Sequence, residues 1–90
     1  MTMTGHAQKR SQQRAIPPIL IDLLRQFGTT EKAAGGVNKV FFDKAARRRV
    51  HAYAGVLGSV LDQYLRVYAV ISNDDEVITV GYLLERVRRQ

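Results

Sequence analysis

The chain of 90 residues has no cysteine and no tryptophan, and its only two prolines are adjacent. The absence of cysteine excludes a disulfide framework and thiol chemistry. No apolar run approaches the ~18 residues that span a bilayer, and the opening residues, MTMTGHAQKR, lack the apolar segment of a secretory signal. We therefore expect a cytoplasmic protein that has no membrane partner.

Acidic residues are fewer than basic residues in this chain. The chain has 14 lysines and arginines but 8 acidic residues, which gives a formal net charge of +6. Such an excess favours a polyanionic partner, either RNA or another nucleic acid, or an acidic protein. The hydrophobic content of 46% suits a single basic domain over 1–90 with one modest core. Residues 1–5 are expected to be flexible.

An amphipathic helix is predicted over residues 17–27. Pro17 and Pro18 suit its first turn, where the missing N–H groups would have no intrahelical partner. Gly28 follows the last apolar residue and is placed to end the helix as a left-handed C-cap. The apolar residues recur at the spacing of one helical face, and they are Ile16, Ile19, Leu20, Leu23, Leu24 and Phe27.

Two β-hairpins are predicted further along the chain. Gly35 and Gly36 permit the positive φ of a tight turn, and Asn73-Asp74-Asp75 supplies a second turn. The first hairpin ends in Phe41-Phe42, whose side chains point to opposite faces, so we expect neither face to be solvated there. The strands are expected at 29–33, 37–42, 65–71 and 76–82, and the two hairpins are expected to pair.

A third helix is predicted after Asp43, whose carboxylate can cap the first turn. Gly55 and Gly58 interrupt it at a cost of about 1 kcal/mol each, so a kink or two abutting helices is as compatible with the sequence as one rod. Its expected core stripe is Ala46, Val50, Tyr53, Leu57, Val60 or Leu61, and Tyr64. Tyr68 is also expected in or near the core, which leaves Tyr82 as the most exposed tyrosine.

These elements give the order α-α-β-β-α-β-β. An order of this kind predicts an α+β fold in which the helices pack on one antiparallel four-stranded sheet. His6 and His51 are the only histidines, and neither has a ligand partner at metal-binding spacing. Phosphate-loop and nucleophile-elbow motifs are absent. We therefore expect no metal and no cofactor.

The remaining candidates are cations. The first predicted helix, residues 5–15, is polar, and His6, Arg10 and Arg14 share one face at a spacing of four. The two arginines could hold successive phosphates, and His6 could supply acid–base chemistry. The alternative for each of these groups of cations is a solvated surface with no binding role. The nucleic-acid-binding candidates are Arg10, Arg14, Lys44, Arg47, Arg48, Arg86 and Arg88, and the catalytic candidates are His6, Arg10 and Tyr82.

Four stretches, HAQKRSQQRAIPP, LLRQFG, FFDKAARRR and AVISNDDEVITVG, resemble a family of small bacterial proteins of unknown function. That family resembles the RelE/ParE toxin superfamily of toxin–antitoxin systems, several of whose basic α+β members cut mRNA on the ribosome without a metal. The resemblance implies RNA binding, a possible metal-independent endoribonuclease activity and an antitoxin as acidic partner. The chain departs from the family pattern at Ala15, where glycine is usual, and at Gly81-Tyr82-Leu83, where glycine, histidine and arginine are usual.

These departures favour binding over catalysis, because proton transfer needs a positioned acid or base. The leading hypothesis is a toxin-like RNA-binding domain, with endoribonuclease activity left open. The alternative is a non-catalytic inhibitor or accessory factor from a mobile element, which docks on an acidic or nucleic-acid-processing partner.

Overall fold

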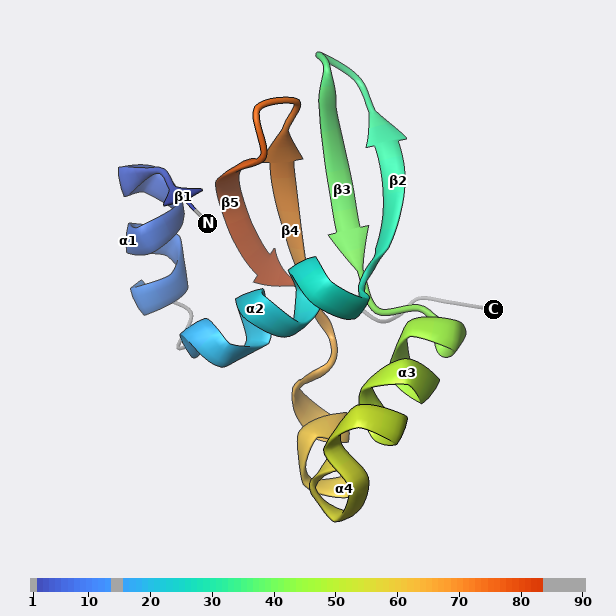
Figure 1. The fold of residues 1–90 in the computed structure, drawn as a ribbon. Coiled ribbons are helices and arrows are strands. Elements are labelled where there is room, and N and C mark those ends of the chain that lie inside the picture. The colour runs from blue at the N-terminus through green and yellow to red at the C-terminus, as the bar shows by residue number, and fades with distance from the viewer. Residues whose placement is uncertain (1, 14–15, 84–90) are drawn as a thin grey trace.

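The structure is a computed structural model that describes residues 2–13 and 16–83, with side chains described for 4–9 and 16–83. The predicted α+β class and the order of its helices and four main strands are confirmed (Figure 1). The elements are β1 (Thr2–Met3), α1 (Gly5–Gln13), α2 (Pro18–Phe27), β2 (Thr29–Ala33), β3 (Val37–Phe41), α3 (Lys44–Ala54), η1 (Gly55–Leu57), α4 (Gly58–Leu61), η2 (Asp62–Tyr64), β4 (Val67–Ser72) and β5 (Glu76–Tyr82), where η marks a 3₁₀ turn.

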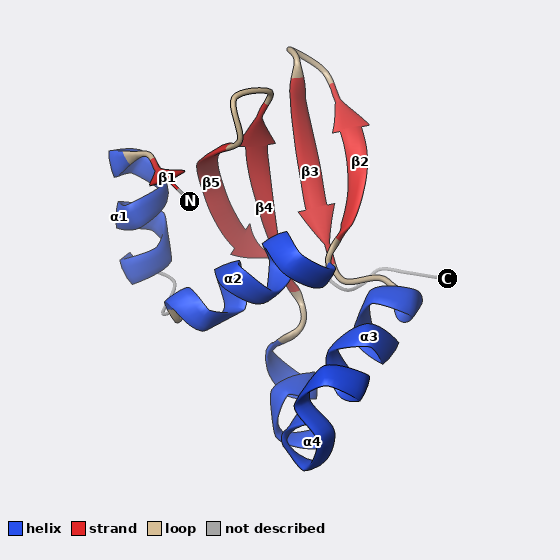
Figure 2. Cartoon of the chain, viewed as in Figure 1, coloured by secondary structure: helices blue, strands red, loops and turns tan. Residues whose placement is uncertain are grey.

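The sheet has the strand order β1-β5-β4-β3-β2 (Figure 2). Strands β2 to β5 are antiparallel, as predicted, and the two hairpins pair through β3 and β4. Strand β1 was not predicted; it adds two residues in parallel to the edge of β5, within the segment expected to be flexible. Thr4 then links this edge to α1, because its hydroxyl donates to the Ile78 carbonyl at 3.1 Å and accepts from the Ala7 N–H at 3.1 Å.

The core lies on one face of the sheet. Along β4 the side chains alternate between buried and half-buried, with Val67, Ala69 and Ile71 on the buried side. Helix α2 crosses this side (Figure 1), and every strand residue of the core cluster belongs to it. The cluster comprises Ala7, Ile16, Leu20, Ile21, Leu23, Leu24, Val40, Phe42, Ala46, Val50, Leu65, Val67, Ala69, Ile71, Val77 and Val80.

Helix α2 ends at the predicted residue and begins one residue later than predicted, with Pro17 as N-cap and Pro18 in the first turn. The expected left-handed C-cap is wrong, since Gly28 has φ −67° and ψ 157°. A Cβ at this position would lie 2.4 Å from the Leu24 carbonyl oxygen and 2.6 Å from Val40 Cγ1. Glycine is needed here because helix and strand approach closely. Ile19, expected on the apolar face, is 56% exposed.

Helix α3 begins at the predicted cap and breaks at the predicted glycines. The expected core stripe is partly right: Ala46 and Val50 are buried, and Leu61, expected as the alternative to Val60, is half-buried and packs against the core cluster. Figure 1 shows that the second half of α3 and α4 extend beyond the end of the sheet, where Tyr53 contacts the Phe27 ring, with centroids 5.1 Å apart, but stays largely exposed. The stripe residues that are exposed are Tyr53, Leu57, Val60 and Tyr64.

Candidate nucleic-acid interface

The second face of the sheet is not covered by any helix in the described ranges. It carries Lys39 and Phe41 from β3 and Tyr68 and Val70 from β4, all of them half-buried, and we call this surface the open face. Phe41 and Tyr68 are direct cross-strand partners in the register, so their side chains stand next to each other on one side of the pleat. An open antiparallel sheet with paired aromatic residues on its outer side is therefore the main surface feature of the strands.

A lysine ammonium lies above this aromatic pair. Lys39 Nζ is 5.4 Å from the ring centroid of Tyr68 and 6.0 Å from that of Phe41, which is within cation–π range. Glu31 is the cross-strand partner of Lys39 on the other side, in β2. The open face thus combines two aromatic rings, one cation held over them and one acid at its margin.

Two of the predicted cations lie at the same end of the sheet as Phe41. Lys44 follows Phe41 by three residues, which span at most ~10 Å of chain, and Arg48 lies one helical turn further along the same face of α3. Both side chains are exposed. Lys44 and Arg48 therefore follow the aromatic end of the open face closely along the chain, a connection to Phe41 that had not been made from the sequence.

The other two α3 arginines hold the helix in place. The Arg47 guanidinium donates to the Leu65 carbonyl at 3.0 Å, and the Arg49 guanidinium donates to the Phe27 carbonyl at 2.9 Å. These bonds attach the start of α3 to the residues before β4 and to the end of α2. Arg47, predicted to bind nucleic acid, is thus engaged with the backbone of its own chain.

Asp43 caps the N-terminus of α3, directly before the cations of that helix. Asp43 Oδ1 accepts from the Ala46 N–H at 2.8 Å. This bond, with smaller contributions from the Thr29 hydroxyl and the charge of Arg49, lowers the pKa of the Asp43 carboxyl below its usual value. The carboxylate is accordingly charged at neutral pH, where it also opposes the unfavourable effect of cations in the first turn of a helix.

Two of the predicted catalytic residues, His6 and Tyr82, are attached to different parts of β5. His6 lies in the first turn of α1, which Thr4 ties to Ile78 near the start of β5. Tyr82 lies four residues further along β5, or about 13 Å at the rise of an extended strand. Tyr82 is 39% exposed, less than Tyr53 at 67%, and pairs with Val67 on the core side of the sheet. The side chains of Arg10 and Arg14, and all of Arg86 and Arg88, lie outside the described residues.

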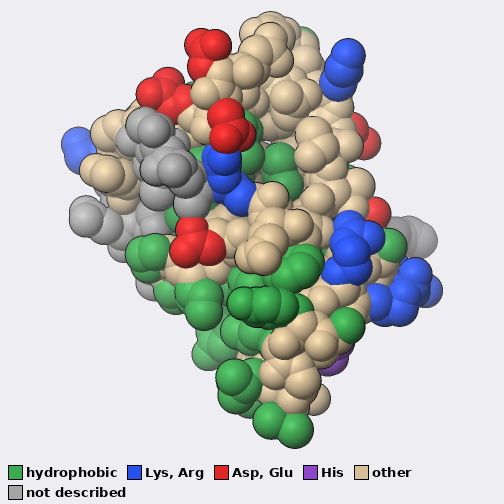
Figure 3. Space-filling view, viewed as in Figure 1, with side chains coloured by type: hydrophobic (Ala, Val, Ile, Leu, Met, Phe, Trp, Pro, Cys, Tyr) green, Lys and Arg blue, Asp and Glu red, His purple; other side chains and the backbone are tan. Residues whose placement is uncertain are grey.

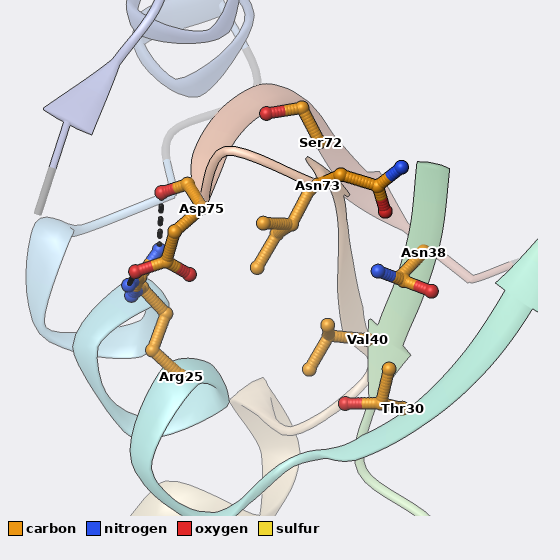
Figure 4. Close-up of a pocket in the computed structure, with 8 residues that line it drawn as sticks. Arg25, Thr30, Asn38, Val40, Ser72, Asn73 and Asp75 are labelled. Atoms are coloured by element: carbon orange, nitrogen blue, oxygen red, sulfur yellow. Dashed lines mark hydrogen bonds and ion pairs between the residues drawn. The ribbon is translucent and has the colours of Figure 1, made fainter. Parts of the chain in front are cut away.

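A small polar pocket of about 260 Å³ lies on the helix side of the sheet. Figure 4 shows Val40 pointing into it, with Asn38 and Thr30 on one wall and the Arg25–Asp75 ion pair on the other. Its volume is below the ~300–1,000 Å³ that is typical of small-molecule sites. We therefore do not assign a ligand to this pocket.

Within residues 2–13 and 16–83, no group of three or more His, Cys, Asp or Glu side chains is placed to hold a metal ion. No described helix is both long and apolar enough to cross a membrane. Comparison with protein families, with curated proteins and with solved structures found no match for this chain. The assignment of function therefore depends on the surfaces themselves.

The open face was missed from the sequence, although its signal was present. Alternation along 37–41 places Lys39 and Phe41 on the same side, and Tyr68 has the same parity as Val70 on the next strand. From the sequence, this strand was expected to be buried on both sides at its end, because apolar residues point to both faces there. The structure buries only the side of Val40 and leaves the side of Phe41 half-exposed.

Proposed function

We propose that the chain is a single-stranded nucleic-acid-binding domain that holds bases against the open face. The observation that carries this proposal is the cross-strand pair of Phe41 and Tyr68 beneath the ammonium of Lys39. Sheets that bind single strands use aromatic side chains as platforms on which unpaired bases stack. A base on Tyr68 would leave its phosphate within reach of Lys39.

The second part of the proposal is that nearby cations bind the phosphates of the strand. Lys39 lies over the aromatic pair, and Lys44 and Arg48 on α3, which begins three residues after Phe41, would supply two further phosphate contacts. Three phosphate contacts with a single strand predict a slope of about −2.1 for log affinity against log salt. Between 50 and 200 mM salt, this slope corresponds to about an 18-fold loss of affinity.

Cleavage is not part of this proposal. A metal-free endoribonuclease would need an acid and a base near the same phosphate, whereas the helix of His6 is tied to Ile78 and Tyr82 lies about 13 Å of strand beyond Ile78. The ribonuclease activity and the antitoxin partner that the resemblance implies remain predictions. Binding without turnover is the function that the described residues support best.

The test is fluorescence anisotropy with a labelled oligonucleotide of about eight residues, a length within the site sizes of such folds. We expect a single-stranded oligouridine to bind more tightly than a hairpin duplex of equal charge. Lys44→Ala should reduce the salt slope by about 0.7, whereas Lys32→Ala, in β2 away from the aromatic end, should change it less. Equal affinity for duplex and single strand would refute the stacking proposal, and RNA cut in EDTA would restore the nuclease hypothesis.

A further inference from the structure

The ammonium of Lys39 lies over the rings on which the proposed function places a base. Its Nζ atom is 5.4 Å from the ring centroid of Tyr68 and 6.0 Å from that of Phe41. Both rings are half-buried, and they lie on the side of the sheet away from α2. Figure 3 views the molecule from the side of α2, where hydrophobic side chains gather over α3 and α4 at the lower end. The aromatic pair with its lysine is thus separate from the apolar surface of the helices.

A stacked base and the ammonium compete for the same space. Stacked rings lie about 3.5 Å apart, which is the optimal separation of non-bonded carbon atoms. An ammonium over the Tyr68 ring and 5.4 Å from its centroid therefore overlaps a base that is centred on this ring. A base can stack on Tyr68 only after Lys39 has moved off the ring.

The rings hold this ammonium weakly. Neither ion pair of the described residues includes Lys39, although Glu31 is its cross-strand partner on β2. A cation–π contact at an exposed site corresponds to about a 2- to 5-fold preference for the contact over its absence. A phosphate oxygen carries a full negative charge and forms charge-assisted hydrogen bonds, so it is a better partner for the ammonium than the rings are.

We propose that Lys39 makes stacking conditional on a phosphate, so that the open face selects phosphate-bearing nucleotides over uncharged bases. The inference rests on the proposed function, because it uses the same aromatic pair for stacking. In the free protein the ammonium covers Tyr68 and Phe41. A base that arrives with its phosphate displaces the ammonium from the rings and receives it at the phosphate. A base without a phosphate displaces the ammonium and offers it no new partner.

These two roles of Lys39 predict opposite effects on two ligands. For a phosphodiester oligouridine, Lys39→Ala removes one phosphate contact and should reduce the magnitude of the salt slope by about 0.7. For an uncharged oligouridine with methylphosphonate linkages, the same substitution only uncovers the rings, so affinity should rise by about 2- to 5-fold. A lysine that served as a phosphate contact alone would leave the affinity for the uncharged strand unchanged.

Anisotropy of both labelled strands, measured with wild type and Lys39→Ala, tests the proposal. Lys39→Arg keeps a cation that stacks on aromatic rings, so it should bind both strands like wild type. Lys32→Ala, on the adjacent strand β2 with its side chain on the other side of the sheet, is the matched control and should not change the affinity for the uncharged strand. An unchanged or lower affinity of folded Lys39→Ala for the uncharged strand would overturn the proposal.

The same assay separates this inference from the proposed function. If Tyr68→Ala binds the phosphodiester strand like wild type, the open face does not stack bases and both proposals fail. If Tyr68→Ala weakens binding but Lys39→Ala does not improve binding of the uncharged strand, stacking stands and the selective role of Lys39 is excluded.

A second experiment follows Lys39 directly in the wild-type protein by NMR. Protons above an aromatic ring resonate upfield, so the ε-methylene protons of Lys39 should resonate upfield of those of Lys32, which is exposed on β2. Addition of the phosphodiester strand should remove this upfield shift, because the ammonium leaves the rings. An upfield shift that persists in the saturated complex, or that is absent from the free protein, would overturn the proposal.

Discussion

Removal of the Tyr68 ring is the sharpest test of the open face. Tyr68 is half-buried, pairs with Phe41 across the strands and lies 5.4 Å from Lys39 Nζ. Stacking of one base on an aromatic side chain is worth about 1–3 kcal/mol by alanine substitution. Tyr68→Ala should therefore weaken binding of a single strand by about 5- to 150-fold.

The salt dependence separates stacking from charge. Stacking involves no counterion release, so Tyr68→Ala should lower affinity at every salt concentration and keep the slope of the wild type. Tyr68→Phe retains the ring and should bind like wild type. The assay is anisotropy of a labelled oligouridine between 50 and 200 mM salt, with thermal unfolding as the check that each variant folds. Wild-type affinity in a folded Tyr68→Ala protein would refute the reasoning.

Three further predictions concern the margin of the open face and the fold that supports it. Glu31→Gln removes the acid across from Lys39, so affinity for the oligonucleotide should rise by up to about fivefold. A lower affinity would contradict binding of the oligonucleotide next to Glu31. The lowered pKa of Asp43 means that its stabilising effect is complete above pH ~4 and is lost as pH falls through the lowered value. Asp43→Asn keeps a capping side chain, so its free energy of unfolding in urea should approach that of wild type below that pH. Gly28→Ala should cost about 1–3 kcal/mol because a Cβ has no room, whereas the melting temperature of Gly5→Ala, with nothing within 4 Å, should not fall.

The strands and turns could be predicted because their signals are local. Gly35 and Gly36 both adopt positive φ, at 82° and 74°, as a tight turn requires. Strand β5 begins and ends at the predicted residues, and the Asp43 cap follows from a short polar side chain before a helical pattern. In each case a few adjacent residues determine the backbone, so no knowledge of the rest of the fold is needed.

The surfaces could not be predicted in the same way, because exposure depends on what packs against an element. Tyr53 continues the helical stripe of Ala46 and Val50, yet it lies past the end of the sheet and is exposed. Phe41 follows the buried Val40 in an apolar strand, yet no described helix reaches its side. Strand β1 is only two residues long, which is too short for any periodic pattern.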